Sequence, residues 1–288
     1  MRRISRLILI YATFANGDPF HMQMRRSQAA VFVLALCLAS AAATSARDLY
    51  VDCAGRGTSD ACTVEQPCST LRQAIRMLQR GNSATIWLLS PADIACSETA
   101  PLQVYSLQLA IARKGAGHAV LQFNVTNGFL ALNSSLQLSN VIIERATSAI
   151  DLNNSNLRAE NTQFRFNDIA VTSDLRANVT FHSCAFSRNR QALVFDHSPS
   201  PHAAPAIRIS ACMFTKNSNS HGPIVDFRWN PRAAPAGRLA LDIVSSTFAD
   251  NSRASLEEDE TVLGGIVAIN TEDQDASVRI VDCMFVNN

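Results

Sequence analysis

Carboxylates are the residues of this chain best suited to chemistry, because strand-like patterns place several of them on expected outer faces. Carboxylates could act as an acid/base pair that cleaves a glycosidic bond, or several of their oxygens could bind calcium. One expected outer column, formed by the middle residues of five apolar strands, reads Asp151, Ala170, Val194, Asp226 and Ala268. Its two aspartates are three strands apart, about 14 Å at ~4.8 Å per strand, which is too far for them to cooperate.

A second expected outer column is mildly basic and contains no paired carboxylates: Gln137, Arg158, Thr180, Arg208, Asp242 and Arg279. The acidic run at 257–260 lies in an insertion and is typical of a solvated loop. His197 and His202 lie in a Pro-rich insertion without a set of metal-ligand partners. We therefore predict no catalytic residue, no cofactor and no metal site, and we keep an enzyme as the alternative.

Cysteines fall into two groups once Cys37, in a predicted signal segment, is set aside. The first group suggests two disulfides in an oxidising compartment, with a pairing that spacing alone does not fix: Cys53, Cys62, Cys68 and Cys96. A zinc site is the alternative for these four, although no CxxC spacing occurs.

The second group comprises Cys184, Cys212 and Cys283, each two residues before a repeated Phe; Thr162 and Ser246 fill the same slot in other copies. We expect a column of small buried side chains with free thiols. Neighbouring strands lie about 4.8 Å apart, whereas a disulfide needs its Cβ atoms nearer 3.8 Å. Cys212 and Cys283 are also separated by an intervening copy.

A sequence repeat occupies the second half of the chain, and such a repeat indicates the architecture of the whole fold. Five copies of an aliphatic–polar phrase end in F-x-x-N, with the pairs Phe164 and Asn167, Phe186 and Asn189, Phe214 and Asn217, Phe248 and Asn251, Phe285 and Asn288. A weaker copy, "LQLSNVII", has Ile143 in place of Phe. We expect the Phe side chains to stack inside. The Asn side chains would lie at a corner, tolerate a left-handed conformation and hydrogen-bond to local backbone or to one another in a ladder.

The repeat predicts an all-β fold of parallel strands. Residues alternate with the period of a strand in "VTFHSCAF", and Ser183 marks a bend between two short strands. A third strand precedes each phrase, at 149–152, 169–171, 192–195, 224–227 and 266–269. The copies differ in length because of insertions, which a coil tolerates at its corners. We predict a right-handed parallel β-helix, a solenoid in which each coil contacts only its neighbours.

The N-terminal part predicts a cap on this solenoid. Thr70 and Gln73 form a capping-box pair, and Leu71, Ile75 and Leu78 give a short helix one apolar face. A disulfide-bonded amphipathic helix would cover the open end of the first coil, where strand edges are otherwise exposed. We assign 47–118 to the cap and first coils and 119–288 to the repeats.

Targeting signals indicate an exported protein. Residues 24–46 show the basic, apolar and small-residue order of a secretory signal, and the apolar run is shorter than the ~20 residues of a membrane span. We interpret 1–23 as a non-native upstream extension with Met24 as the start, and we predict a secreted or cell-surface protein without a further membrane span. Four sequons are candidates for glycosylation in a eukaryotic source: Asn124, Asn133, Asn153 and Asn178.

The stretches "YVDCAGRGT", "PCSTLRQAI" and "ATIWLL" resemble the N-terminal segment of pectin-lyase-like right-handed β-helix proteins. The F-x-x-N copies, with "GGIV" at 264–267, resemble the F-x-x-N/GGA[ILV] repeat of the chlamydial polymorphic outer-membrane proteins, which include adhesins. Only one copy keeps the double Gly. "SHG" at 220–222 resembles the G-H-G motif of polygalacturonases, but the aspartates of that family have no counterparts here.

The expected function is a non-catalytic binding, adhesion or structural module, with an extracellular glycan or a cell-surface receptor as partner. The alternative is a polysaccharide lyase or glycoside hydrolase of the pectin-lyase-like superfamily. A formal net charge of +1 argues against nucleic acid, which calls for a strong basic excess. Because a well-formed copy stands last in the sequence, we expect a chain truncated at its C-terminus, or contact with another chain at that coil.

Secreted material should begin near Thr44 or Arg47, since cleavage is expected after Ala43 or Ala46. Mass spectrometry of the N-terminal peptide, taken from the medium of expressing cells, measures this directly. A secreted protein that retains Met1 would contradict both the signal and the start-site assignments.

Overall fold

The structure is a computed structural model, and it describes residues 46–55, 61–78, 82–91, 94–124, 127–174, 177–196, 206–219, 222–228, 239–253, 266–270 and 276–288. Residues 46–288 form one compact unit. The predicted signal segment, His197, His202, His221 and the acidic run at 257–260 lie outside the described residues.

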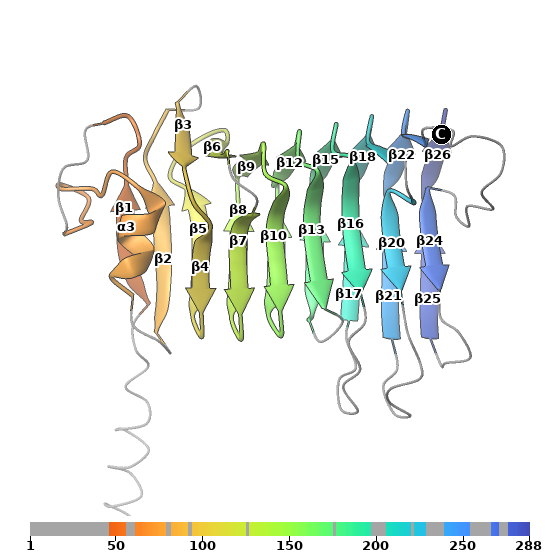
Figure 1. Cartoon of the computed structure of the whole chain (residues 1–288), viewed down its shortest axis with the longest axis horizontal. Helices are drawn as coiled ribbons and strands as arrows, with labels where there is room; N and C mark the ends of the chain where they lie inside the picture. The colour runs from red at the N-terminus through yellow and green to blue at the C-terminus, as the bar shows by residue number, and fades with distance from the viewer. Residues whose placement is uncertain are drawn as a thin grey trace, which may run out of the picture. The chain divides into compact units, whose positions relative to one another are not determined.

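Three parallel sheets build this unit, and successive coils lie side by side from β1 to β26 (Figure 1). The first sheet contains, in order, β1 (Arg47–Val51), β2 (Ser83–Leu88), β5 (Gln108–Arg113), β8 (Ser135–Ser139), β11 (Asn156–Glu160), β14 (Val179–His182), β17 (Ala206–Ser210), β21 (Leu239–Val244) and β25 (Ala276–Val281). The second contains β3 (Ala95–Glu98), β6 (Ala119–Phe123), β9 (Val141–Glu144), β12 (Gln163–Arg165), β15 (Ala185–Ser187), β18 (Met213–Thr215), β22 (Thr247–Ala249) and β26 (Met284–Val286). The third contains β4 (Leu102–Tyr105), β7 (Asn127–Leu132), β10 (Ser148–Asn153), β13 (Ile169–Asp174), β16 (Gln191–Asp196), β20 (Val225–Arg228) and β24 (Val267–Asn270). A short fourth pairing joins β19 (Ser218–Asn219) to β23 (Ser252–Arg253).

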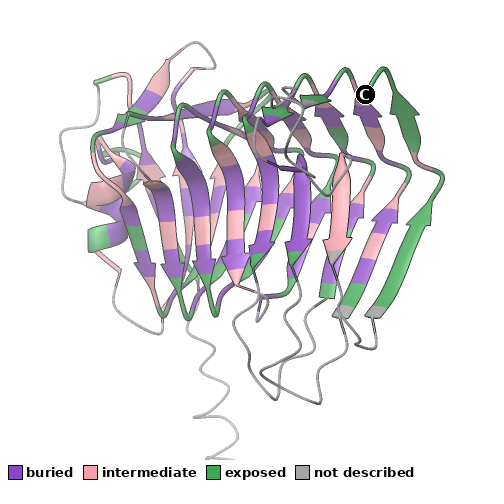
Figure 2. Cartoon of the chain, turned by 45° about the vertical axis from the view of Figure 1, so that its right-hand side comes forward, coloured by how far each residue is buried: buried purple, intermediate pink, exposed green. Residues whose placement is uncertain are grey.

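This is the predicted parallel β-helix, since each strand pairs in parallel with the equivalent strand of the next coil. Burial alternates along the strands, as Figure 2 shows, so one face of every sheet lines a shared core. The bend between β14 and β15 falls at Ser183, which has φ 52°.

The repeated Phe residues stack inside the coil in register. Phe186 lies 5.0 Å from Phe164 and 4.6 Å from Phe214 between ring centroids, with nearly parallel planes. Phe248 continues the stack at 4.5 Å from Phe214, and Phe285 follows at 4.8 Å. Each buried ring contributes roughly 1.5–3 kcal/mol by removal from water. The weaker copy fits the same column, because Ile143 pairs with Phe164.

The repeated Asn residues form a buried ladder beside the stack. The Asn189 Nδ2 donates to Asn217 Oδ1 at 3.1 Å and to the carbonyl of Phe164 at 2.9 Å. The Asn189 Oδ1 accepts from the backbone N–H and the Nδ2 of Asn167, both at 3.0 Å. The same pattern continues through Asn251 to Asn288. Each coil is thus tied to the next by amide hydrogen bonds whose groups are fully used.

One expectation about this corner was wrong. The left-handed conformation belongs to the residue before each Asn, and the Asn itself does not adopt it. At this corner the residues before the five repeated Asn are Phe166, Arg188, Lys216, Asp250 and Asn287, with φ between 50° and 56°, and Arg145 before Ala146 in the weaker copy has φ 60°. The turn therefore points these preceding side chains outward and directs the amide inward to the ladder.

The N-terminal cap consists of the helix α3 (Leu71–Arg76) and two disulfides. Cys53 is bonded to Cys96 and Cys62 to Cys68, which excludes the zinc alternative for these cysteines. The Thr70 side chain caps the helix by accepting from the Gln73 N–H, while the Gln73 Oε1 accepts from the Ser69 N–H. Leu71 and Ile75 are buried against the first coil. Within the described residues, no helix is long and apolar enough to cross a membrane.

Replacing Phe214 by Ala should lower the free energy of unfolding by about 3–5 kcal/mol, as large-to-small changes in a core do. Phe214 is fully buried between two stacked rings. The matched control is Phe166→Ala, since Phe166 is 45% exposed and should cost less than about 1 kcal/mol. Urea denaturation followed by circular dichroism measures both, and equal losses in the two variants would contradict a stabilising Phe stack.

Candidate functional site

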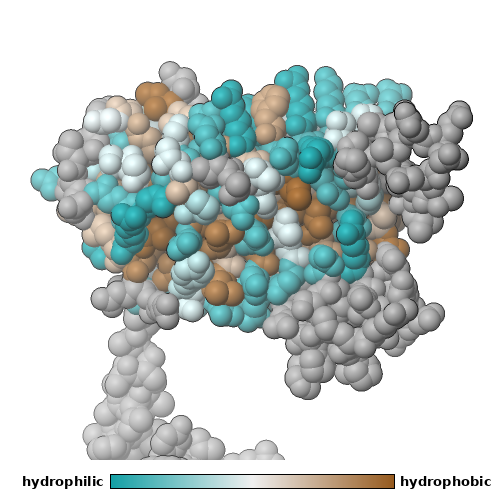
Figure 3. Space-filling model, viewed as in Figure 1, coloured by the Kyte–Doolittle hydropathy of each residue, from teal (hydrophilic) through white to brown (hydrophobic). Residues whose placement is uncertain are grey.

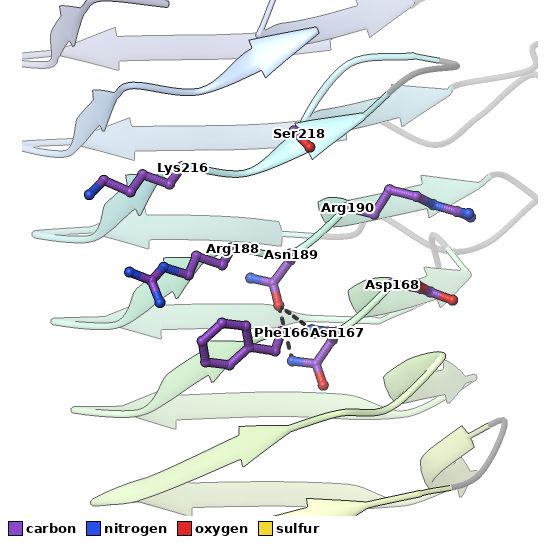
Figure 4. A pocket seen from close by; sticks show the side chains of 8 residues that line it. All are labelled: Phe166, Asn167, Asp168, Arg188, Asn189, Arg190, Lys216 and Ser218. Carbon is purple, nitrogen blue, oxygen red and sulfur yellow. Dashed lines mark hydrogen bonds between the residues drawn. The ribbon is translucent and has the colours of Figure 1, made fainter. Parts of the chain in front are cut away.

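A groove runs over the Asn ladder at the corner between the second and third sheets. It is defined by eight residues and has a volume of about 580 Å³: Phe166, Asn167, Asp168, Arg188, Asn189, Arg190, Lys216 and Ser218. Asn167 and Asn189 lie between two walls, as Figure 4 shows. We call this feature the ladder groove.

The middle of the ladder groove has no free polar groups. The Asn189 amide, for example, donates one hydrogen to Asn217 and the other to the Phe164 carbonyl, and its oxygen accepts from Asn167 of the preceding coil. A ligand here cannot displace these bonds without leaving buried groups unpaired, at a cost of about 1–3 kcal/mol each. Recognition must therefore come from the walls.

The first wall is made by the left-handed residues, which the turn points outward. Phe166 exposes 45% of its surface. The guanidinium of Arg188 lies 5.3 Å from the centroid of the Phe166 ring, and that of Arg165 lies 6.0 Å away. Lys216 occupies the equivalent position on the coil after Arg188. This wall thus presents an aromatic ring with cations beside it.

The second wall carries Asp168, Arg190 and Ser218, each directly after a ladder Asn and exposed. Arg165 is neutralised by the buried Glu144, whose Oε2 lies 2.6 Å from its Nε. In contrast, Arg188, Arg190 and Lys216 form no ion pair with any residue that the structure describes. Hydrophilic side chains also line much of the upper edge of the molecule in Figure 3, interrupted by one apolar column. The groove therefore carries an excess of positive charge.

The first-sheet column has the register expected from the sequence: Gln137, Arg158, Thr180, Arg208, Asp242 and Arg279 are strand partners in that order. Its single acid is neutralised. Asp242 pairs with Arg279 at 2.7 Å and with Arg208 at 3.5 Å. The hydrogen bond from Arg279 is the main reason that the pKa of Asp242 is lowered. This column offers no general acid.

The third-sheet column departs from expectation at one position. Asp151, Val194, Asp226 and Ala268 are aligned, but their neighbour on β13 is Thr172, and Ala170 is fully buried. The reason is that Ala170 and Val171, which follow a half-buried Ile169 on β13, are both buried, so the alternation of inward and outward residues resumes only at Thr172.

Two further acids lie at the ends of these strands, and sequence reasoning missed them. Asp174 and Asp196 are strand partners on β13 and β16. The sequence predicts that the two strands end at residues 171 and 195, so both carboxylates fall outside them. A signal was present in the sequence, because Asp174 and Asp196 follow the apolar pairs of their strands at the same spacing. Asp174 accepts from the backbone N–H of Asn154 at 3.0 Å. Asp226, buried beside them, pairs with Arg228 at 2.6 Å.

Asp151 is half-buried on β10. Burial raises its pKa, and the negative charge of Asp174 raises it further. Carboxyl groups held in different environments can divide acid and base roles between them. No group of three or more His, Cys, Asp or Glu side chains suited to a metal occurs within the described part of the chain.

The remaining candidates have structural or untested roles. Cys184, Cys212 and Cys283 carry free thiols in one column with Thr162 and Ser246. Each side chain of this column donates to the carbonyl two residues before it. The hydrogen bond with the Cys212 thiol, together with burial, raises the pKa of Cys184, so its thiol stays protonated. The sequon asparagines are exposed, at Asn124, Asn133, Asn153 and Asn178, and their glycosylation stays a prediction.

Comparison with known proteins gives little beyond this geometry. No protein-family model matches the chain, and no curated protein matches it. Among the solved structures that match is one titled rhamnogalacturonan lyase, with 11% identity, a TM-score of 0.42, and coverage of 71% of this chain and 69% of that one. This likeness is too distant to carry an argument about activity.

Substituting Asp174 by Asn should lower the pKa of Asp151 toward its ordinary value, because it removes a neighbouring negative charge. The part of the rise that comes from burial should remain. Carboxyl-carbon NMR titration measures the shift. The control is Asp226→Asn, which lies three coils from Asp151 and should leave its pKa unchanged. Equal shifts in both variants would contradict a specific interaction between Asp151 and Asp174.

Proposed function

We propose that this protein is an extracellular, non-catalytic binding module that holds an acidic glycan in the ladder groove. The observation that carries the proposal is the exposed Phe166 ring with Arg188 beside it and with Lys216 and Arg190 nearby. An aromatic face stacks on the C–H face of a sugar ring, while unpaired cations bind its carboxylate or sulfate groups. The predicted signal at 24–46 and the two disulfides agree with an extracellular location.

The direction of the groove favours a linear ligand. Phe166, Arg188 and Lys216 occupy one position on successive coils, so the wall extends along the coil axis in steps of about 4.8 Å. Asp168, Arg190 and Ser218 repeat in the same way on the other wall. A polymer lying along the axis would contact both walls over several residues. The Phe and Asn side chains beneath the groove take no direct part, because they are buried in the coil: Phe164, Phe186, Phe214, Asn167, Asn189 and Asn217.

A cleaving enzyme is the second candidate, and one observation favours it. Burial, and after it the neighbouring Asp174, raises the pKa of Asp151, and carboxyl groups in different environments can divide acid and base roles. Against this role, Asp174 is engaged by the backbone of Asn154, and Asp226 by Arg228. We therefore place binding ahead of cleavage.

The test is a panel of uronate-containing, sulfated and neutral polysaccharides, followed in parallel by affinity gel electrophoresis and by release of reducing ends or unsaturated products. Retention of the protein on acidic polymers without cleavage is expected. The double change Arg188→Ala and Lys216→Ala should weaken retention by roughly tenfold or more, since two charge-assisted contacts are lost.

The matched control removes cations of the first sheet, in Arg208→Ala and Arg279→Ala, which should leave retention on acidic polymers unchanged. Equal weakening in both double variants would indicate non-specific charge attraction and contradict the groove. Cleavage that disappears in Asp151→Asn would establish the enzyme instead.

A further inference from the structure

We propose that the outer face of the first sheet carries a second ligand site, built around Trp87, that takes the uncharged rings of a neutral saccharide. The site is formed by Trp87, Ala112, Ser139 and Glu160, which are strand partners in that order on β2, β5, β8 and β11. We call it the Trp87 shelf. It stands independently of the ladder groove, which lies at a different corner of the coil.

The geometry of the shelf follows from the sizes of these side chains. Trp87 is partly exposed at one end, and Glu160 keeps 46% of its side chain exposed at the other. Between them Ala112 and Ser139 are short, so this column carries no long side chain between the indole and Glu160. The shelf spans three strand steps, about 14 Å, which leaves a low, flat strip along the coil axis.

The indole is held in place by its neighbours. Its Nε1–H donates to the Asp48 Oδ1 at 3.1 Å, which fixes the ring relative to β1. Tyr50 is the strand partner of Trp87 on the side away from the shelf, and the Lys114 ammonium lies 5.0 Å from the centroid of the Tyr50 ring. A ring fixed in this way loses little conformational freedom on binding, which favours affinity.

The charges around the shelf point to a neutral ligand. Arg158 and Glu160 form an ion pair at 3.8 Å, and Asp48 and Lys114 contribute one charge of each sign. The exposed carboxylates of Asp48 and Glu160 accept hydrogen bonds from hydroxyl groups. A pyranose ring supplies both requirements, since it has an apolar face for the indole and hydroxyl groups at its edge.

The small size of the shelf argues against a protein partner. A stable protein interface uses about 20–30 residues on each side. The strip next to Trp87 has only a few short side chains, and the neighbouring column on the same face carries the polar Gln137 and Arg158. A saccharide of two or three units fits such a strip better than a second chain does.

The experiment titrates the protein with neutral oligosaccharides of three to six units from β-glucan, xylan, mannan and galactan, and follows tryptophan fluorescence. The chain has two tryptophans, so Trp229→Phe makes Trp87 the only indole and serves as the parent protein. We expect at least one oligosaccharide to change the fluorescence saturably. In isothermal titration calorimetry, Trp87→Ala should weaken its binding about tenfold.

A second variant protects the test against misfolding. Ala112→Arg places a long side chain on the shelf, leaves Trp87 in place and should also abolish the fluorescence change. The control is Tyr105→Ala, which removes a partly exposed aromatic ring from the third sheet and should bind as the parent does. The proposal is overturned if no oligosaccharide perturbs Trp87, or if Trp87→Ala binds as tightly as the parent.

The two proposed sites fail separately. Loss of acidic-polymer retention in the Arg188→Ala and Lys216→Ala variant, with the neutral saccharide still bound, would locate the two ligands on different faces. If both ligands depended on Trp87, the shelf would be the general saccharide site and the ladder groove would not be a site.

Discussion

The buried asparagine ladder is the constraint on which the rest of this structure depends. Parallel strands of successive coils are held together by sheet hydrogen bonds, but those bonds do not fix where a coil must turn. The ladder fixes the position of the turn, because each amide must hydrogen-bond to the Asn amides of the two neighbouring coils and to the carbonyl of the Phe one coil earlier. A coil shifted by one residue would leave these buried groups without partners, at about 1–3 kcal/mol for each. The Phe stack beside the ladder adds apolar burial to the same register.

This constraint also determines what the surface can present. Because the amide must point inward, the residue before it takes a left-handed conformation and points outward, although it is not glycine. The backbone at that position is therefore fixed by the turn, while its side chain can differ between copies. Here the position carries Phe166, Arg188 and Lys216 on successive coils. The ladder groove is thus a consequence of the turn at each ladder Asn. Its charges and its aromatic ring come from the residues before the Asn, which differ between copies, and its spacing comes from the repeated Asn.

The sequence reveals the inside of such a protein more readily than its outside. The five F-x-x-N copies predicted the coil, the Phe stack and the amide ladder, because buried residues repeat under the same physical demand. Outward residues repeat under no such demand, and reasoning from them was less accurate. Ala170 was assigned to the surface because strict alternation was assumed from Ile169 onward, whereas Ala170 and Val171 are both buried. Asp174 and Asp196 were missed because charged residues at a strand end look like the start of a turn. The spacing of the charged residues did not predict the ladder groove. Its first wall depends on the left-handed residue before each Asn, whereas the sequence predicts that conformation for the Asn itself.

The two proposed ligand surfaces differ in the way their affinity would arise. The ladder groove relies on cations without ion-pair partners among the described residues, so its contacts weaken as salt screens them over about 8 Å at physiological ionic strength. The Trp87 shelf is balanced in charge and relies on apolar contact with a fixed ring, which salt does not screen. Both surfaces extend along the coil axis, because each is built from equivalent positions on successive strands. A chain that carries both would hold an acidic and a neutral polymer on different faces, each roughly parallel to the coil. A rigid solenoid suits that task, since its stacked core fixes the two faces relative to each other while leaving their side chains exposed.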